Sequence, residues 1–242
     1  MSFHGVPVIY GINTKSTETT PSHQLGALGV TSDGRKFRYC QVAGTDIAIG
    51  KLCIAADIST QHEGLAVNTA AIGDKSLTIT LGSTAIVGNE YQEGLVMVTN
   101  DTGEGETYTI KSAPPTALST DVVVTLIEPI RVAFAAGTTV TLVRNKFRDV
   151  LISDGALANL PVGVTPVAAA ASEFFWIQTG GYAAVQNDAT TTVVAGQPVT
   201  IGDVTSGAVE VINAATEMYV GVVPAGVVGA TEEHITVELT LD

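Results

Sequence analysis

The Gly-rich segment Asp101–Glu106 contains the residues whose types come closest to those of a metal site. Asp101, Glu104 and Glu106 place three carboxylates in one short loop, and Ca²⁺ prefers hard oxygen ligands of this kind. The segment lacks the Asp-x-Asp-x-Asp-Gly spacing of a dedicated calcium loop. We therefore predict a solvated hairpin turn and no metal site, although the pattern leaves open whether Asp101, Glu104 and Glu106 bind a cation.

The four histidines show no arrangement that could perform catalysis. His4, His23, His62 and His234 lie in unrelated contexts, without a carboxylate or a nucleophile at motif spacing. The chain contains no G-x-S-x-G, H-E-x-x-H or phosphate-binding loop motif. We interpret the histidines as solvated loop residues, and we predict that the protein is not an enzyme and uses no cofactor.

Two short basic runs, each with an interleaved Phe, form the candidate binding surface. Such runs can bind phosphate or nucleic acid. However, 11 Lys and Arg against 24 Asp and Glu leave a net charge of −13, which disfavours binding to a phosphate backbone. We expect no nucleic-acid partner, and we expect the basic groups to pair with acidic residues within the chain or on a neighbouring subunit. The candidate interface residues are Arg35, Lys36, Arg38, Arg144, Lys146 and Arg148.

A group of aromatic residues could bind a sugar. Phe174, Phe175, Trp176 and Tyr182 lie close together in the sequence, and aromatic rings present large apolar faces. Because successive strand residues point to opposite faces, either Phe175 with Ile177 or Phe174 with Trp176 must face inward as core. A carbohydrate-binding module is therefore the weakest of the functional hypotheses.

Alternation of apolar and polar residues is the main structural signal. Ser76–Leu81, Thr139–Val143 and His234–Leu241 alternate residue by residue, as half-buried strands do. The last of these has its four apolar residues on one face, so we expect it to be integral to the fold. Gly and Asp-Gly turns recur about every ten residues, a spacing typical of sandwiches and barrels. The sequence predicts an all-β fold, an antiparallel β-barrel or sandwich with a second small β domain and little helix.

Composition divides the chain into an arm and two domains. The polar residues 1–24 are expected to form an extended arm that becomes ordered on a partner. Residues 25–70 with 147–242 predict the main domain, and residues 71–146 predict a second β domain that could be inserted into the first. All Lys and Arg lie between Lys15 and Arg148, so residues 149–242 contain no basic side chain apart from histidine.

Two segments of the main domain echo each other. Phe37–Gly44 precedes Ile49–Leu52, and Phe175–Gly181 precedes Ala195–Val199. Each pair reads as an aromatic strand that ends in Gln-x-x-Gly, then a loop and a second strand. We interpret them as two equivalent hairpins of one barrel or sandwich, with a chance similarity as the alternative.

The cysteines and the absence of targeting signals bear on location. Cys40 and Cys53 lie in strand-like surroundings, so we predict two buried free thiols rather than a disulfide framework. The N-terminus has no signal-peptide pattern, and no apolar run reaches the length of a membrane span. We expect synthesis in a reducing cytoplasm and no membrane partner.

Three stretches carry a family resemblance: Leu25–Tyr39, Glu93–Val98 with Gly103–Ser112, and Phe174–Val185. They resemble segments of accessory head proteins of tailed bacteriophages, the decoration or cement proteins that sit on an assembled capsid. The resemblance implies a non-enzymatic, β-rich protein that forms oligomers, often trimers, and binds the capsid shell. It carries over no individual binding residue.

The leading functional hypothesis is therefore a virion structural protein that decorates and stabilises the capsid. Its expected partners are the major capsid protein and further copies of itself, as a trimer, and its expected location is the capsid surface after synthesis in the host cytoplasm. The alternative is another virion component, such as a tail, baseplate or fibre subunit. Fibres usually contain long tandem β repeats, and this chain has only the single echo.

Overall fold

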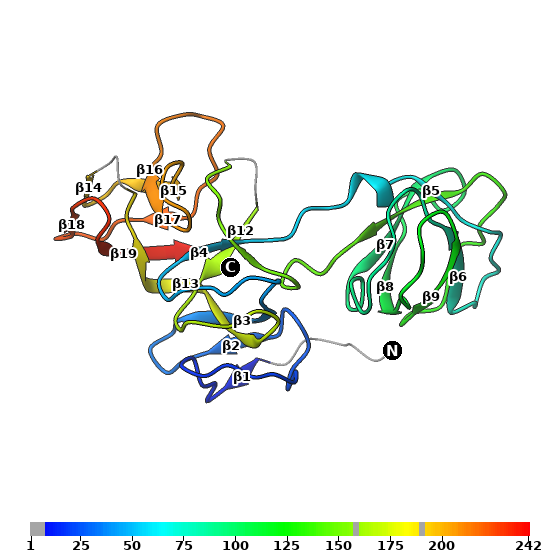
Figure 1. Ribbon diagram of the computed structural model, residues 1–242, viewed down its shortest axis with the longest axis horizontal. Coiled ribbons are helices and arrows are strands. Elements are labelled where there is room, and N and C mark those ends of the chain that lie inside the picture. Colours follow the sequence, from blue (N-terminus) through cyan, green and yellow to red (C-terminus); the bar gives the residue numbers. More distant parts are fainter. Residues whose placement is uncertain (1–7, 157–159, 189–191) are drawn as a thin grey trace. The chain divides into compact units, whose positions relative to one another are not determined.

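The chain divides into two compact units, which are Met1–Ala56 with Lys146–Asp242, and Asp57–Asn145. The computed structural model describes residues 8–156, 160–188 and 192–242 (Figure 1). Within these ranges the fold is all-β as predicted, and the single helical element is the short 3₁₀ turn η1, Thr60–His62. No helix in these ranges has the length and apolar character needed to cross a membrane.

The larger unit contains a large sheet and a separate two-stranded ribbon. The sheet has 11 strands, all paired antiparallel except β1 with β2. Its main path runs β1-β2-β3-β13-β19-β17-β15-β16, and β12, β4 and β11 branch from β13. The ribbon pairs β14 with β18. The strands are β1 (Ile9–Tyr10), β2 (Leu28–Val30), β3 (Lys36–Gln41), β4 (Leu52–Ile54), β11 (Leu151–Ile152), β12 (Pro161–Val164), β13 (Phe174–Gln186), β14 (Val193–Val194), β15 (Pro198–Ile201), β16 (Val209–Val211), β17 (Gly221–Val222), β18 (Val228–Gly229) and β19 (His234–Thr240).

The long strand β13 belongs to two hydrophobic cores. Its first half pairs with β3, from Phe174 opposite Gln41 to Gly180 opposite Lys36, and its second half pairs with β19. In Figure 1, β13 (yellow) lies between β3 (blue) and β19 (red). Phe174–Ile177 pack in one apolar cluster together with β3, while Ala183 and Val185 pack in another with β19. The apolar run and the alternating segment of this strand therefore serve different cores.

The smaller unit is a nearly closed β-barrel. Its strands are ordered β5-β10-β7-β8-β9-β6, and a bridge between Val67 and Ile79 connects the segment after β5 to β6. Alternate residues of each strand, including Leu77, Val96 and Val124, fill a single apolar core. The strands are β5 (Leu65–Ala66), β6 (Ser76–Thr80), β7 (Leu95–Asn100), β8 (Thr107–Ser112), β9 (Asp121–Leu126) and β10 (Thr139–Val143).

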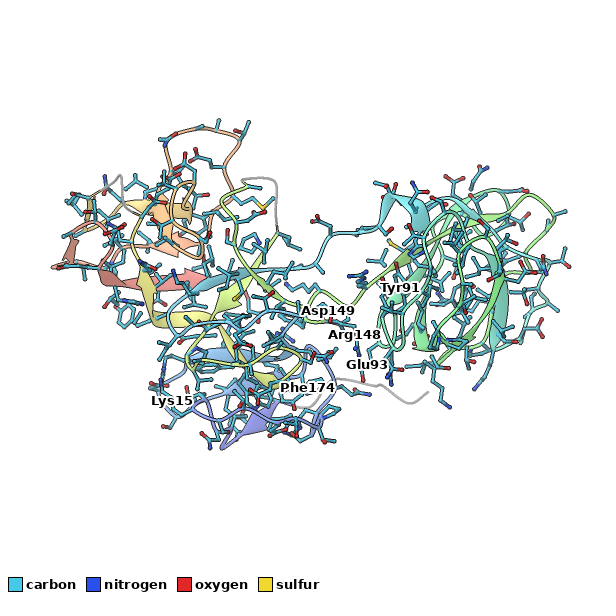
Figure 2. All side chains as sticks on the ribbon, in the orientation of Figure 1. Lys15, Tyr91, Glu93, Arg148, Asp149 and Phe174 are labelled. Carbon is cyan, nitrogen blue, oxygen red and sulfur yellow. The ribbon has the colours of Figure 1, made fainter. Side chains whose placement is uncertain are left out.

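The boundary of the smaller unit differs from the sequence-based expectation. The unit begins at Asp57 rather than at residue 71, because β5 pairs with β10 and so belongs to the barrel. This pairing joins the start of the unit to its end, a geometry that allows one domain to be inserted into another. Figure 2 labels Tyr91 within this unit and Phe174 within the larger one.

The N-terminal segment, expected to be an arm that becomes ordered on a partner, packs against its own chain over its described part. β1 pairs with β2, Glu18 forms a two-way backbone bridge to Phe174 at 2.9 and 2.8 Å, and Ser22 N–H donates to the Tyr39 hydroxyl at 3.1 Å. Tyr39 O–H in turn donates to Glu18 at 2.8 Å. Residues 8–24 are therefore ordered on their own chain, because their polar groups find partners there. Residues 1–7 lie outside the described ranges.

The two echoing segments are not equivalent hairpins. β3 and the first half of β13 pair directly with each other, with Phe175 opposite Cys40 and Trp176 opposite Tyr39. Their similar sequences reflect a shared environment, since both strands contribute aromatic side chains to the same cluster. The rings of Tyr39 and Trp176 lie 5.2 Å apart.

Substitutions in the C-terminal strand β19 test which of its faces is buried. Leu239 is 2 % exposed and its neighbours are β13 and β17, whereas Thr236 is exposed on the other face. We expect Leu239→Ala to lower the free energy of unfolding by about 2–5 kcal/mol. The matched variant Thr236→Ala should change it by less than about 0.5 kcal/mol. Urea unfolding followed by circular dichroism measures both, and equal losses would contradict the assigned faces.

Candidate functional site

A pocket of about 330 Å³ lies on the larger unit, near the bend of β13 and the β2–β3 turn. It collects residues from six separate segments: the N-terminal region, the turn before β3, residues 49–50, the end of β12 with the loop after it, β13 and the start of β19. The side chains that matter for binding are Lys15, Arg35, Gln178, Tyr182 and His234. Of these, only Arg35 and Tyr182 were singled out for a binding role from the sequence.

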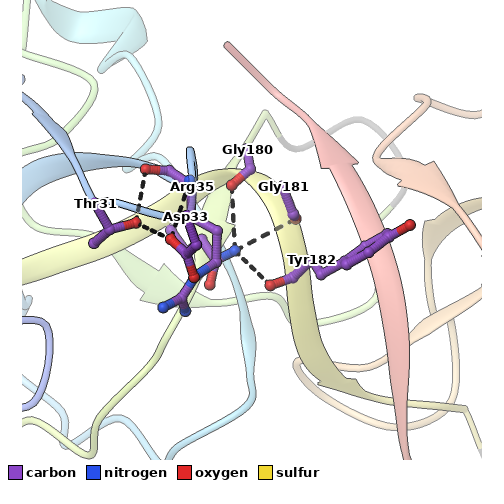
Figure 3. A network of polar contacts seen from close by, with 7 residues as sticks. Thr31, Asp33, Arg35, Gly180, Gly181 and Tyr182 are labelled. Atoms are coloured by element: carbon purple, nitrogen blue, oxygen red, sulfur yellow. Dashed lines mark hydrogen bonds and ion pairs between the residues drawn. The ribbon is translucent and has the colours of Figure 1, made fainter.

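The bend of β13 is held by the amide of Gln178. Its Nε2 donates to the carbonyl oxygens of Gly180 at 3.2 Å, Gly181 at 3.3 Å and Tyr182 at 2.8 Å (Figure 3). Gly181 has φ of +80°, and a Cβ there would lie 2.9 Å from Cγ of Arg35. The bend thus requires glycine both for its backbone conformation and for the close approach of Arg35.

Arg35 is held at the pocket by the tight turn before β3. Its Nε donates to Asp33 Oδ2 at 2.7 Å, and the hydroxyl of Thr31 donates to Asp33 Oδ1 at 2.5 Å (Figure 3). These hydrogen bonds, from Thr31 first and then from Arg35, hold the pKa of Asp33 below its usual value. The guanidinium carbon also lies 5.6 Å from the centre of the Phe37 ring. Arg35 therefore reaches the pocket from a fixed position.

The pocket offers hydrogen-bond donors suited to an acidic group. Lys15 and Arg35 are cationic, and Tyr182 lines the pocket with 60 % of the residue exposed. Lys15 Nζ also donates to the Pro166 carbonyl at 2.7 Å, and Arg35 Nε to Asp33, which leaves the further N–H groups of both side chains for a ligand. The hydroxyl of Thr165 is already engaged, since it donates to the Ala48 carbonyl at 2.7 Å. Charge-assisted hydrogen bonds to a carboxylate are stronger than neutral ones. The arrangement favours binding of a carboxylate or a similar anion.

Gln178 allows the bend to be tested. Replacement by Leu should lower the free energy of unfolding by about 1–3 kcal/mol, because three carbonyl groups, one buried and two partly buried, lose their donor. The control is Tyr182→Phe, which removes only an exposed hydroxyl and should leave stability nearly unchanged. Thermal unfolding of both variants checks this, and an unchanged Gln178→Leu protein would show that the amide does not hold the bend.

Three of the predicted interface residues gather around Asp242. Arg38 donates to both carboxylate oxygens of Asp242, from Nε at 2.7 Å and from Nη2 at 2.9 Å. Lys36 Nζ donates to the Asp242 backbone oxygen at 3.2 Å, and the charge of Lys146 also acts on the carboxylate. Burial favours the neutral acid, but the hydrogen bonds from Arg38 and Thr179 outweigh it and lower the pKa of Asp242.

The remaining basic residues lie elsewhere. Arg144 belongs to the smaller unit, where it forms an ion pair with Glu90. Arg148 belongs to the larger unit, where Nη1 donates to Gln41 Oε1 at 3.0 Å. Arg35, as described, pairs with Asp33. Pairing within the chain, one of the two outcomes expected from the sequence, is therefore observed for Arg35, Arg38 and Arg144.

The Arg38–Asp242 pair has a predictable pH dependence. Because the folded-state pKa of Asp242 is lowered, its ionic contribution is present above the usual value of 3.8 and is lost as the pH falls through the folded-state pKa. Asp242→Asn should cost about 1–2 kcal/mol of unfolding free energy near neutral pH and much less near pH 3. Asp33→Asn, which removes an exposed pair, should have a smaller effect. A pH-independent loss in Asp242→Asn would contradict the ionic origin.

His62 corrects the interpretation that the histidines are solvated. It is fully buried in the smaller unit, with Nε2 3.1 Å from the Thr84 carbonyl and Nδ1 2.5 Å from the Tyr91 hydroxyl. Because a carbonyl only accepts, Nε2 donates and Nδ1 accepts from Tyr91. Burial, together with the charge of Glu90, raises the pKa of Tyr91 to about 12. The pair thus satisfies two polar groups inside the barrel unit.

The other histidines have separate surroundings. His23 packs against Tyr39 and Trp176, with ring centres 5.3 and 5.2 Å apart. His234 lines the pocket, where its ring leaves no room for a side chain at Gly50. His4 lies outside the described ranges.

The proposed sugar platform does not form. Phe174, Phe175 and Trp176 are 8, 1 and 4 % exposed, and only Tyr182 reaches the surface. Both faces of the first half of β13 are covered, so not one but both pairs of alternating residues face the core. The aromatic cluster serves as core.

The acidic loop Asp101–Glu106 does not gather its carboxylates around one point. Asp101 and Glu104 are exposed, and Glu106 Oε2 lies 2.6 Å from Nη2 of Arg131. Among the described residues, the carboxylates close enough to hold one ion lie elsewhere, in the larger unit.

The prediction of two buried free thiols is confirmed. Cys40 and Cys53 are both buried and unpaired. Burial raises the pKa of each thiol far above its usual value, so both are poor nucleophiles.

Sequence reasoning missed Lys15, Gln178 and His234 as pocket residues because they come from distant segments. The one local signal was the Gln178-Thr179-Gly180-Gly181 pattern, since glycine within a strand marks a bulge or a close approach.

Comparisons of the chain with protein-family models, with curated proteins and with solved structures found no match.

Proposed function

We propose that the protein is a virion structural protein of a tailed bacteriophage, which decorates the assembled capsid and performs no catalysis. Its partners would be the major capsid protein and further copies of itself, arranged as a trimer on the capsid surface. The observation that carries the proposal is an uncharged strip on the outer wall of the barrel. A tail, baseplate or fibre subunit is the alternative assignment.

The outer strip crosses four neighbouring segments of the smaller unit. Leu95 of β7 lies opposite Val143 of β10 and Thr109 of β8, and Ile127 N–H donates to the Thr109 carbonyl at 2.9 Å. One step along the strands, Met97 lies opposite Thr141 and Thr107. Leu95, Met97 and Ile127 are 37, 38 and 40 % exposed. We define the outer strip as Leu95, Met97, Thr107, Thr109, Ile127, Thr141 and Val143. None of these side chains is charged, and the nearest carboxylate, that of Glu128, lies at the Thr109 edge, where it accepts from the Thr109 N–H at 2.9 Å and from its hydroxyl at 3.1 Å.

An uncharged strip on a chain with net charge −13 favours a protein partner. The centres of protein interfaces are depleted of charged residues, and apolar patches on a surface commonly mark interaction sites. Subunits with net negative charge repel one another. A contact through uncharged side chains keeps the negative charges of the two subunits farther apart and so weakens this repulsion. The strip thus suits close packing between copies or against a shell.

The strip coincides with one of the stretches that resemble phage head proteins. Glu93–Val98 and Gly103–Ser112 contain β7 and β8, which contribute Leu95, Met97, Thr107 and Thr109 to the strip. Because the resemblance carries over no binding residue, the exposed side chains of this hairpin are the reason to assign the interface to it.

The pocket on the larger unit supplies a second contact of opposite chemistry. Residues 149–242 contain no Lys or Arg and many carboxylates, so an acidic side chain of a neighbouring subunit is a ligand that Lys15 and Arg35 could bind. Individual surface ion pairs contribute only about 0–1 kcal/mol. In this proposal apolar burial supplies the affinity, and the pocket sets the orientation of the subunits.

Replacing two apolar residues of the strip tests the proposal. Leu95→Lys with Met97→Lys should weaken binding to capsid particles by about 100-fold or more, because two charged groups would enter a dry contact. Both positions point away from the barrel core, so the fold should persist. The control is Ile72→Lys, at a 69 % exposed apolar position of the same unit that lies outside the strip. Unchanged binding by the double variant would contradict the assigned interface.

Labelling of purified virions tests the proposed location on the capsid. An antibody raised against the protein, carrying gold, should label the heads of purified virions in electron microscopy. Light scattering of the free protein should give the mass of a trimer. Label confined to tails would favour the alternative, and label on no particle would overturn the virion assignment.

A further inference from the structure

Three carboxylates of the larger unit converge just beyond the end of β13. Asp188 follows β13, Asp203 lies in the turn between β15 and β16, and Glu210 lies in β16. One oxygen of each carboxylate lies within 4.8 Å of the others. Asp188 and Glu210 are 0 and 3 % exposed, whereas Asp203 is exposed. Two buried acids and one surface acid therefore converge on a small volume.

Backbone hydrogen bonds fix this convergence. Asp188 N–H donates to the Val209 carbonyl at 2.9 Å, which holds the end of β13 against β16. Asp188 Oδ2 accepts from the N–H groups of Val204 at 3.1 Å and Thr205 at 3.0 Å, so it orders the turn that carries Asp203. A Cβ at Gly202 would lie 2.4 Å from the same oxygen. The position of the Asp188 carboxylate is thus fixed by backbone contacts.

The hydroxyl of Thr200 is a separate sign of a ligand at this place. Thr200 is fully buried, and its Oγ1 has no hydrogen-bond partner in the described part of the chain. It lies directly opposite Glu210 in the β15–β16 pair, so the two side chains share a face. Val199, Ile201 and Val209 pack into the apolar core on the other face. A buried hydroxyl without a partner is costly, and a bound ion is one way in which such a group is satisfied.

The carboxylates of the cluster repel one another. Burial and the negative charges of Asp203, Asp188 and Glu217 raise the pKa of Glu210 to about 7. Lys51 is the basic residue that contacts the neighbouring turn at Gly207, and its amine donates to the Ser206 carbonyl at 2.8 Å. A cation at the cluster would therefore relieve a local repulsion.

We propose that Asp188, Asp203 and Glu210, together with the hydroxyl of Thr200, bind one Ca²⁺ ion. The ligands are all oxygen atoms, which selects hard cations over Zn²⁺ or copper. Ca²⁺ accepts irregular sets of carboxylate, hydroxyl and carbonyl oxygens, whereas Mg²⁺ usually keeps several of its waters. Because Asp188, Glu210 and Thr200 are withdrawn from solvent, the site suits the ion that gives up its waters more readily. The ion would tie the end of β13 to the β15–β16 hairpin, whether or not the protein decorates a capsid.

Calorimetry on the full chain, first stripped with chelator, tests the site. We expect one Ca²⁺ per chain, a higher unfolding temperature with CaCl₂, and a smaller shift with MgCl₂ at the same ionic strength. Asp203→Asn removes an exposed ligand with little risk to folding and should weaken Ca²⁺ binding by about tenfold or more. The control is Asp101→Asn in the acidic loop of the smaller unit, which should bind Ca²⁺ as the unaltered chain does.

Thr200→Val separates ion binding from general stability. The variant keeps the shape of the side chain and removes the hydroxyl without a partner, so the chelated protein should be as stable as the unaltered chain or more so. Its stabilisation by Ca²⁺ should be smaller. The proposal is overturned if the unaltered chain binds no Ca²⁺, if Asp203→Asn binds it unchanged, or if Asp101→Asn abolishes binding.

Discussion

The larger unit depends on one strand that pairs with two different sets of neighbours. β13 bonds to β3 with residues 174–180 and to β19 with residues 180–186, and each half packs in its own apolar cluster. The two apolar clusters are therefore connected by the backbone of this one strand. A strand in this position must be apolar on both faces in its first half and must alternate in its second, which is the pattern that Phe174–Gln186 shows. Its change of direction is absorbed at Gly180 and Gly181.

Both candidate sites of the larger unit occur where the regular pairing of β13 stops. A regular ladder satisfies its own backbone groups and leaves few donors or acceptors for a ligand. At the bend, Gln178 replaces the missing ladder bonds and leaves a hollow that Arg35 and Tyr182 border. At the end of the strand, Asp188 bonds to the turn after β15 and brings its charge beside Glu210. The positions of the sites follow from the path of the strand.

The sequence predicts the strands better than it predicts their partners. Ser76–Thr80 and His234–Thr240 are strands as their alternation indicates, because side-chain period is a local property. Register is a long-range property, so the similarity between Phe37–Gly44 and Phe175–Gly181 suggested two separate hairpins, although these segments form neighbouring strands. Polarity misled in the same way for residues 8–24, since Glu18 and Ser22 find their hydrogen-bond partners on distant strands.

The acidic residues show most clearly that a local sequence pattern does not reveal long-range contacts. Asp101–Glu106 attracts attention because its carboxylates are adjacent in the chain, yet exposed neighbours of like charge separate in water, and Glu106 pairs with Arg131. Asp188, Asp203 and Glu210 have ordinary local contexts: an acid after a strand, an acid in a turn, and a Glu on the polar side of a short hairpin opposite a Thr. Their convergence requires the end of β13 to lie against β16. In the sheet, β16 is connected to β13 through β15, β17 and the C-terminal strand β19. The three acids therefore come together only when β19 is paired with β13. A site of this kind is therefore determined by topology, and its residues can be recognised only once the order of the strands is known.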